Sequence, residues 1–127
     1  MSRVIIIGGG AAGMLSGIVA ARNGHFVTIL EKNEKLGRKL FITGKGRCNL
    51  TNACDMETLL SNVKSNPKFM YSSFYGFSNY DVIDFFEQLG LRTKIERGER
   101  VFPVSDKSSD VIMVLETALR QLGVKIR

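Results

Sequence analysis

Cysteine, histidine and proline are scarce in this sequence, and each shortage excludes a class of protein. Two cysteines, Cys48 and Cys54, are too few for a disulfide framework, so we expect a reducing, cytoplasmic location. The single histidine, His25, has no second histidine with which to form a metal cluster and is expected in an exposed turn, so no metal is predicted. Two prolines and 44% apolar residues are typical of a globular chain rather than a disordered one.

Long charge-free segments are also rare, and the main one is not interpreted as a membrane span. Val4 to Ala21 is an uncharged run behind Arg3, as a short span or a secretion signal would be. Its glycines dilute the hydrophobicity and cluster at a turn, which neither kind of segment requires. We therefore predict no membrane association.

Acidic residues are outnumbered, with 12 Asp and Glu against 18 Lys and Arg, and the formal net charge is +6. This balance favours an anionic partner such as a nucleotide, a nucleic acid or an acidic membrane surface, without choosing among them. A nucleic-acid surface would use the aromatics of residues 69–80 for base stacking. Few cations follow Lys68 there, so we favour helix packing or a substrate-domain contact and predict no nucleic-acid partner.

The 127 residues fit one domain, which begins with the pattern of a strand, a helix and a second strand. The β-branched run Arg3 to Ile7 predicts a strand buried on both faces, as in a parallel sheet. Helical spacing predicts a helix from Ala11 to Asn23, and Phe26 to Leu30 predicts the second strand. Residues 1–31 are therefore expected to form a dinucleotide-binding βαβ unit.

The rest of the chain divides into three further segments. Residues 32–53 are rich in Gly, Lys and Arg and predict a long ligand-facing loop with a short helix between the glycines. Residues 54–106 predict helices and a hairpin, and residues 107–127 predict a helix with a clear apolar stripe and a third parallel strand. The expected fold class is α/β, with a partial, three-stranded Rossmann-like sheet and an insertion before its third strand.

Within the insertion, the pattern predicts two helices and one hairpin. The first helix is expected from Asp55 or Met56 to Val63. The second runs from Asn79, taken as its cap, to Leu89, with apolar residues on one face. Segments 92–96 and 100–102 around Gly98 predict a hairpin that stops at Pro103.

The glycines after the first strand form GxGxxG, in which each has a separate physical task. Gly8 permits the tight turn, Gly10 lets the backbone approach a pyrophosphate, and Gly13 allows the helix to pack closely on the strand. Free amides near Ala11 and Ala12 direct the positive helix end toward the phosphates. Because the pattern stands between a predicted strand and a predicted helix, it indicates a dinucleotide-binding turn.

Glu31 lies at the end of the predicted second strand, where such sites place an acidic residue. Its carboxylate can accept hydrogen bonds from the adenosine ribose hydroxyls, and its charge would repel a 2'-phosphate, which argues against NADP. The alternative is a glycine-rich turn with a solvated glutamate.

FAD and NAD sites share these features, so the choice between them depends on the length and composition of the chain after Glu31. A plain NAD-binding unit returns to its next strand after one crossover of about a dozen or more residues. Here residues 31–123 intervene, beginning with a basic, glycine-rich loop. We therefore predict FAD as the cofactor, and an NAD-binding domain is the alternative.

The segment LGRKLFITGKGRCNLTN, Leu36 to Asn52, resembles the BaiN and aminoacetone oxidase type of bacterial FAD-dependent oxidoreductases when joined to the glycine turn and Glu31. The segment GERVFPVSDKSSDV, Gly98 to Val111, is similar to the same family. The resemblance covers essentially the whole chain. It implies an FAD domain of glutathione-reductase-like topology, with NAD(P)H as a candidate electron donor in the full-length enzyme.

The resemblance also implies which residues contact FAD. Glu31 would hold the ribose, Arg38 and Lys39 would lie near the nucleotide, and residues 43–49 would run along the pyrophosphate toward the isoalloxazine. The alternative for the basic residues is a solvated charged loop. The predicted cofactor-binding residues are Gly8, Gly10, Ala11, Ala12, Gly13, Glu31, Lys32, Arg38, Lys39, Thr43, Gly44, Gly46, Arg47, Cys48 and Asn49.

The cysteine spacing departs from that of the resembling disulfide reductases. Five residues separate Cys48 from Cys54, whereas the redox pair of those enzymes has four between its cysteines. We therefore favour two unpaired thiols, with Cys48 near the cofactor, over a dithiol mechanism. No catalytic acid or base is recognisable.

Members of the resembling family are several times longer than this chain. We interpret it as the N-terminal portion of such an enzyme, truncated and inactive alone; a non-catalytic nucleotide-binding or interaction module is the alternative. A sheet that ends at its third strand leaves an unpaired edge and uncovered apolar surface, which predicts self-association.

Overall fold

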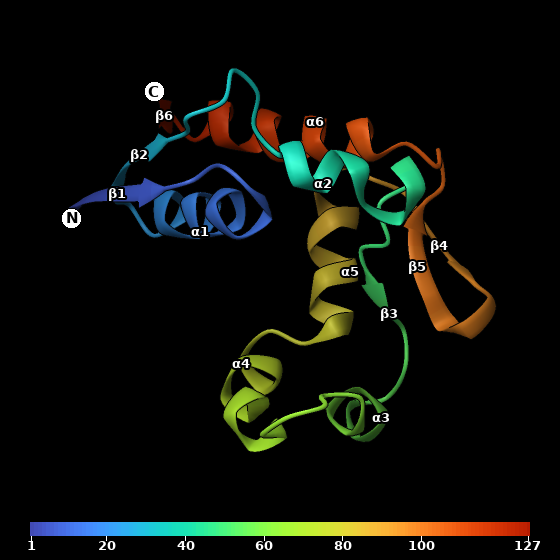
Figure 1. Ribbon diagram of the computed structural model, residues 1–127. Helices are drawn as coiled ribbons and strands as arrows, with labels where there is room; N and C mark the ends of the chain where they lie inside the picture. Colours follow the sequence, from blue (N-terminus) through green and yellow to red (C-terminus); the bar gives the residue numbers. More distant parts are fainter.

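Two three-stranded sheets organise the structure, a computed structural model that describes residues 1–127 (Figure 1). One sheet is parallel, with the strand order β1-β2-β6, and the other is antiparallel, with the order β3-β5-β4. The predicted α/β class and three-stranded parallel sheet are confirmed. The strands are β1 (Arg3–Ile7), β2 (Phe26–Leu30), β3 (Thr51–Asn52), β4 (Thr93–Glu96), β5 (Arg100–Pro103) and β6 (Lys125–Ile126).

The helices join and cover these sheets. The α-helices are α1 (Ala11–Arg22), α2 (Arg38–Ile42), α3 (Met56–Ser61), α4 (Tyr71–Gly76), α5 (Asn79–Gln88) and α6 (Ser108–Gln121). Short 3-10 turns are η1 (Thr43–Gly46), η2 (Pro67–Met70) and η3 (Arg97–Glu99). The loop predicted over residues 32–53 therefore contains α2, η1 and the short strand β3. No helix is long and apolar enough to cross a bilayer.

Helices α1 and α6 pack together over one face of the parallel sheet. Gly17 of α1 makes this approach close, because a Cβ there would lie 3.1 Å from Leu119 Cδ2 and 3.2 Å from Ile29 Cδ1. These contacts form the centre of the hydrophobic core, which also includes Met14 and Ile18. The core thus fixes the orientation of α1, and with it the glycine turn from which α1 starts.

The opposite face of the parallel sheet is uncovered, which corrects the prediction that the first strand is buried on both faces. Burial alternates along β1, and the side chains of Ile5 and Ile7 are 67% and 79% exposed. Phe26 and Leu30 of β2 lie in register on the same open face. An all-apolar strand pattern indicates that both faces can be covered, but in these residues helices cover only one.

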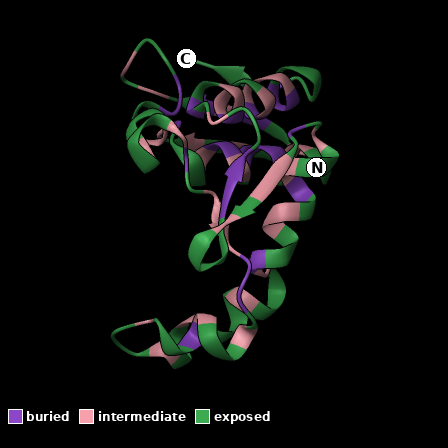
Figure 2. Ribbon diagram, turned by 90° about the vertical axis from the view of Figure 1, so that its right-hand side faces the viewer, coloured by how far each residue is buried: buried purple, intermediate pink, exposed green.

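The insertion extends away from the parallel sheet as an arm, which we define as α3, η2 and α4 (residues 56–76). Helix α5 leads from this arm back to the core (Figure 1), where Phe85 is buried. Figure 2 shows the arm mostly in the colours of exposed and intermediate residues. Helix α4 was not predicted, because its segment lacks both a capping residue and a clear apolar stripe.

The cap of α5 is Ser78 rather than the predicted Asn79. Ser78 Oγ accepts a hydrogen bond from the Asp81 amide, and the Asp81 carboxylate accepts one from the Ser78 amide, forming a capping box. Asn79 is instead buried at the first helical position and donates to the carbonyls of Asn52 and Cys54. It therefore fastens α5 to the segment after β3.

Candidate dinucleotide site

The candidate site begins where β1 ends and α1 starts. Gly8 adopts φ +96°, a conformation that favours glycine, and its amide donates to the Leu30 carbonyl at 2.8 Å. Gly13 has no room for a side chain, because a Cβ there would lie 1.9 Å from the carbonyl oxygen of Gly8. The backbone conformation therefore requires glycine at position 8, and packing requires it at position 13.

Gly10 differs from these two glycines. Its φ of −81° and ψ of −167° suit any residue, and a Cβ there would meet no protein atom within 4 Å. Neither backbone conformation nor packing explains a glycine at this position. A glycine that neither the backbone conformation nor the packing requires is expected where the phosphates of a ligand must come close to the backbone.

Helix α1 starts at Gly10 without a side-chain cap, and its first turn holds no acidic residue. The amides of Ala11 and Ala12 have no acceptor within the helix, because the first N–H groups of any α-helix lack one. Both residues are exposed. The partial positive charge at this helix end is therefore available to an anion.

Glu31 comes directly after β2 and points back to the glycine turn. One carboxylate oxygen accepts from the Gly9 amide at 2.8 Å, and the other accepts from the Asn33 amide at 2.7 Å and its side-chain Nδ2 at 2.9 Å. The hydrogen bonds from the amides of Asn33 and then Gly9 hold the pKa of Glu31 below its ordinary value. An ionised carboxylate thus lies beside the turn at neutral pH.

Two residues of this arrangement, Gly9 and Asn33, were not among the predicted site residues. A Cβ on Gly9 would lie 2.3 Å from Leu36 Cδ2, so the middle one of the three consecutive glycines also serves close packing. Asn33 orients the Glu31 carboxylate and accepts from Arg38 Nη1 at 3.1 Å. The sequence signal was an asparagine two residues after the acidic residue, a spacing at which asparagine commonly bonds to a neighbouring turn.

The predicted basic residues separate into one that is linked to Glu31 and two that are free of such a link. Arg38 reaches the carboxylate through Asn33. Lys32 and Lys39 are exposed, and the charge of Lys32 contributes to the lowered pKa of Glu31. None of these three residues neutralises the Glu31 carboxylate by a direct ion pair.

The loop of residues 43–49 is held in an unusual backbone conformation. Positive φ values occur at Gly44 (55°), Lys45 (56°), Gly46 (85°) and Cys48 (60°). A Cβ on Gly44 would lie 2.8 Å from the Asn49 amide nitrogen, so the loop folds tightly upon itself. The hydroxyl of Thr43 donates to the Leu40 carbonyl at 2.7 Å, which fixes the start of the loop.

The Arg47 side chain turns away from the glycine turn toward the hairpin. Its guanidinium pairs with Glu96 and, at 2.8 Å, with Asp106, and lies 4.0 Å over the ring of Phe102. Hydrogen bonds from Arg47 and then Lys94 lower the pKa of the Glu96 carboxyl, and those from Lys94 and then Arg47 lower the pKa of Asp106. The side-chain amide of Asn49, oriented so that its nitrogen donates, reaches the carbonyls of Thr51 and Val101. Contacts of either residue with FAD stay a prediction.

The two cysteines are unpaired, as predicted, and both are buried. Burial raises the pKa of the Cys48 thiol, and burial and then Glu99 raise that of Cys54, so both are neutral at physiological pH. His25 is half-buried rather than exposed, and its Nδ1 accepts a hydrogen bond from the Ser2 amide at 3.1 Å. No group of three or more metal-binding side chains comes together.

A small apolar cleft brings the glycine turn and the loop together. It has a volume of about 240 Å³ and is lined by Ala11 and Ala12 of α1, by residues 48–50 of the loop, and by Phe85 and Phe86 of α5. Two segments that are far apart in the sequence therefore form one surface next to the positive helix end.

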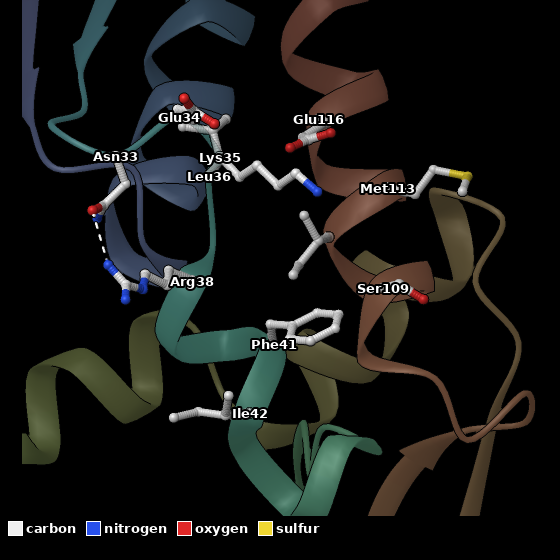
Figure 3. Close-up of a pocket in the computed structure, with 11 residues that line it drawn as sticks. Asn33, Glu34, Lys35, Leu36, Arg38, Phe41, Ile42, Ser109, Met113 and Glu116 are labelled. Atoms are coloured by element: carbon white, nitrogen blue, oxygen red, sulfur yellow. Dashed lines mark hydrogen bonds between the residues drawn. The ribbon is translucent and has the colours of Figure 1, made fainter.

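A larger cleft of about 820 Å³ lies between α2 and α6 and does not include the glycine turn or Glu31. Figure 3 shows Asn33 and Arg38 at one side of it and Lys35 extending toward Glu116 of α6. The cleft between α2 and α6 and the dinucleotide geometry are thus adjacent but separate.

A parallel βαβ unit with this glycine turn defines a Rossmann-type domain of the dinucleotide-binding class. A family model described as "HI0933-like protein Rossmann domain" matches residues 2–127. The chain belongs to this HI0933-like family, and the resemblance inferred from the sequence is confirmed.

Curated relatives name different activities. The chain is 42% identical to the 3-dehydro-bile acid delta(4,6)-reductase of Clostridium scindens, over 99% of this chain and 31% of that protein. It is 30% identical to the ribosomal RNA dihydrouridine synthase of Haemophilus influenzae, over 98% of this chain and 30% of that protein. The chain thus spans about a third of the length of these relatives.

Among solved structures, Thermovibrio ammonificans THI4 has a similar fold. It matches with a TM-score of 0.65 and 12% identity, over 98% of this chain and 37% of that one. At this identity the likeness concerns the fold alone.

Proposed function

We propose that this chain binds the ADP part of FAD and belongs to a flavin-dependent oxidoreductase. The observation that carries the proposal is Gly10, which neither packing nor backbone conformation explains, at a helix end that is open to an anion. The ionised carboxylate of Glu31 beside the same turn suits the ribose of the nucleotide. Membership in the HI0933-like family supports FAD as the dinucleotide.

The proposed roles match the order of groups in FAD. The amides of Ala11 and Ala12 would bind the pyrophosphate, Glu31 would bind the adenosine ribose, and the basic residues Lys32, Arg38 and Lys39 would attract the phosphates. Residues 43–49 and the small apolar cleft would receive the flavin end. Bound FAD would supply the electron transfer, while the protein supplies binding, orientation and electrostatics.

We further propose that the full-length enzyme to which this chain belongs reduces a carbon–carbon double bond conjugated to a carbonyl group. A delta(4,6)-reductase of a 3-dehydro-bile acid and a dihydrouridine synthase both carry out such a reduction, on very different substrates. NAD(P)H is the proposed electron donor. We expect no turnover from these 127 residues alone, because the only ionisable side chain lining the small apolar cleft is the buried thiol of Cys48. The reduced, unpaired thiols fit a cytoplasmic protein.

A nucleic-acid site on the exposed aromatics is not favoured, although one relative is named for ribosomal RNA. Phe69 and Tyr75 both lie in the arm, and their side chains are 78% and 67% exposed. The surrounding segment, residues 55–84, holds four acidic residues and two lysines. Such a balance repels phosphates rather than attracting them.

Parallel titrations with FAD, ADP and NAD test the proposed function. We expect FAD to bind about 10-fold more tightly than ADP or NAD, because only FAD reaches the small apolar cleft as well as the glycine turn. Isothermal calorimetry on the purified chain measures all three affinities. Equal binding of the three ligands would favour a nucleotide-binding module without flavin specificity, tighter NAD binding would favour an NAD-binding domain, and no binding would refute the proposal.

The uncovered sheet face leads us to propose self-association of this chain. Ile5, Ile7, Phe26 and Leu30 form an exposed apolar surface there. Ile7→Lys should shift the sedimentation profile at high concentration toward the monomer, because a charge on this face opposes contact with a second copy. Ser72→Lys in α4 adds the same charge elsewhere and should change nothing. A monomeric wild-type chain at all concentrations would contradict the proposal.

A further inference from the structure

Four charged side chains from three parts of the chain meet beneath the loop of residues 43–49. Arg47 belongs to the loop, Lys94 and Glu96 to β4, and Asp106 to the turn between β5 and α6. Each cation contacts both anions: Lys94 Nζ lies 2.7 Å from Asp106 and 3.1 Å from Glu96, and Arg47 pairs with the same two carboxylates. The exposed fractions of these side chains lie between 28% and 41%. We call these four residues the charge cluster.

Within the charge cluster, only Arg47 joins the loop to the hairpin. Its Nε donates to Asp106, its Nη2 reaches Glu96, and its flat guanidinium stacks on Phe102 of β5. A planar guanidinium that donates hydrogen bonds and also packs on an aromatic ring is fixed in both position and orientation. The ammonium group of a lysine cannot be fixed in this way. Lys94 contacts the same carboxylates from within the hairpin, so it stabilises the hairpin without holding the loop.

The loop requires an outside anchor because of its backbone. Left-handed conformations at Lys45 and Cys48, which are not glycines, are unfavourable for L-residues. Such conformations persist only where the surroundings impose them. Arg47 lies between these two residues, so its anchoring acts at the centre of the strained segment.

The residues directly after Arg47 form a wall of the small apolar cleft. Cys48, Asn49 and Leu50 line it together with Ala11 and Ala12, at the start of α1. We infer that Arg47 is a positioning residue, which the carboxylates of Glu96 and Asp106 hold so that this wall keeps the shape that accepts the flavin end of FAD. This inference rests on the proposed function and adds that the hairpin controls FAD affinity without touching the cofactor.

The test compares Arg47→Met with Lys94→Met, since each removes one cation and two ion pairs from the charge cluster. Arg47→Met should weaken FAD binding by about 10-fold and leave ADP binding within about twofold, because ADP is bound by the glycine turn. Lys94→Met should change neither affinity by more than about twofold. At saturating FAD, the visible circular dichroism of the bound flavin should change in Arg47→Met only. Arg47→Lys should restore little of the FAD affinity.

A double-mutant cycle identifies the partner through which Arg47 acts. The effects of Arg47→Met and Asp106→Asn on FAD affinity should be strongly non-additive, because both remove the same anchor. Equal losses of FAD affinity in Arg47→Met and Lys94→Met, or equal losses of FAD and ADP affinity in Arg47→Met, would overturn the inference.

Hydrogen exchange of the ligand-free chain separates this inference from the proposed function. Arg47→Met should speed exchange of the amides of residues 44–49, and Lys94→Met should not. If wild type binds neither FAD nor ADP, the proposed function fails, while this exchange pattern would still support the anchoring of the loop. Unchanged exchange in Arg47→Met would overturn the inference whatever the ligand affinities are.

Discussion

Gly13→Ala is expected to lower the melting temperature by about 10 °C and to weaken FAD binding, whereas Gly10→Ala is expected to weaken FAD binding alone. A Cβ on residue 13 would lie 1.9 Å from the carbonyl oxygen of Gly8. This oxygen belongs to the backbone, so it cannot rotate away as the end of a flexible side chain would. Separating α1 from the turn should reduce the free energy of unfolding by about 3 kcal/mol. The displaced turn would then present its amides poorly to a phosphate.

At Gly10, replacement by alanine should affect only ligand affinity and not stability. Alanine fits the backbone conformation of this residue, and its methyl group would meet no protein atom within 4 Å. The methyl group would instead occupy the space through which the phosphates approach. We expect the affinities for FAD and ADP to fall together by about 30-fold or more, with an unchanged melting temperature.

Gly76→Ala provides the matched control, because a Cβ there also meets no atom and the residue lies in α4, remote from the turn. Thermal unfolding followed by circular dichroism and calorimetric titration with FAD and ADP measure all three variants. Unchanged FAD affinity in a folded Gly10→Ala would remove the observation on which the proposed function depends.

Local patterns were sufficient to predict the βαβ unit. The strand, turn and helix between residues 3 and 22 are encoded by neighbouring residues, and both β1 and β2 occur within their predicted bounds. Burial of both faces of β1 was predicted wrongly, since the segments that cover a face are distant in the sequence. The exposed Ile5 and Ile7 carry the same sequence pattern as buried strand residues would.

Competing local signals explain the errors within the insertion. Ser78 and Asn79 are both good capping residues, and the sequence alone does not reveal that Asn79 is needed elsewhere. Its side chain bonds to the carbonyls of residues 52 and 54, contacts that exist only once the chain has folded. The ion pairs of Arg47 were likewise not predictable from local patterns, because its partners lie 49 and 59 residues away in the sequence.

Glu31→Ala is expected to weaken ADP and FAD binding by roughly 10-fold to 100-fold, the range typical of losing charge-assisted hydrogen bonds. The variant should also lose selectivity for the ribose. Wild type should bind ADP about 10-fold more tightly than ADP that carries a 2'-phosphate, because the carboxylate repels that group at close range. In Glu31→Ala the two ligands should bind within about twofold of each other.

The pH dependence of binding is set by the pKa of Glu31, which hydrogen bonds from Asn33 and Gly9 lower in the folded chain. A lowered folded-state pKa means that the carboxylate stabilises the turn above its unfolded pKa and loses this effect only as the pH falls through the folded value. The ratio of ADP affinity in wild type to that in Glu31→Ala should therefore stay level from neutral pH down to about pH 5 and shrink below that. Comparing the two proteins cancels the protonation of the terminal phosphate of ADP, which affects both alike.

Glu31→Gln separates charge from hydrogen bonding at this position. The amide keeps one acceptor oxygen, so it can satisfy either Gly9 or Asn33 but not both, and it no longer repels a 2'-phosphate. We expect the selectivity against the 2'-phosphate to disappear as in Glu31→Ala, with a smaller loss of ADP affinity. Selectivity retained in Glu31→Gln would show that steric fit, rather than the charge of Glu31, excludes the phosphate. A loss of ADP affinity that is accompanied by a lower melting temperature would instead assign Glu31 to the stability of the turn.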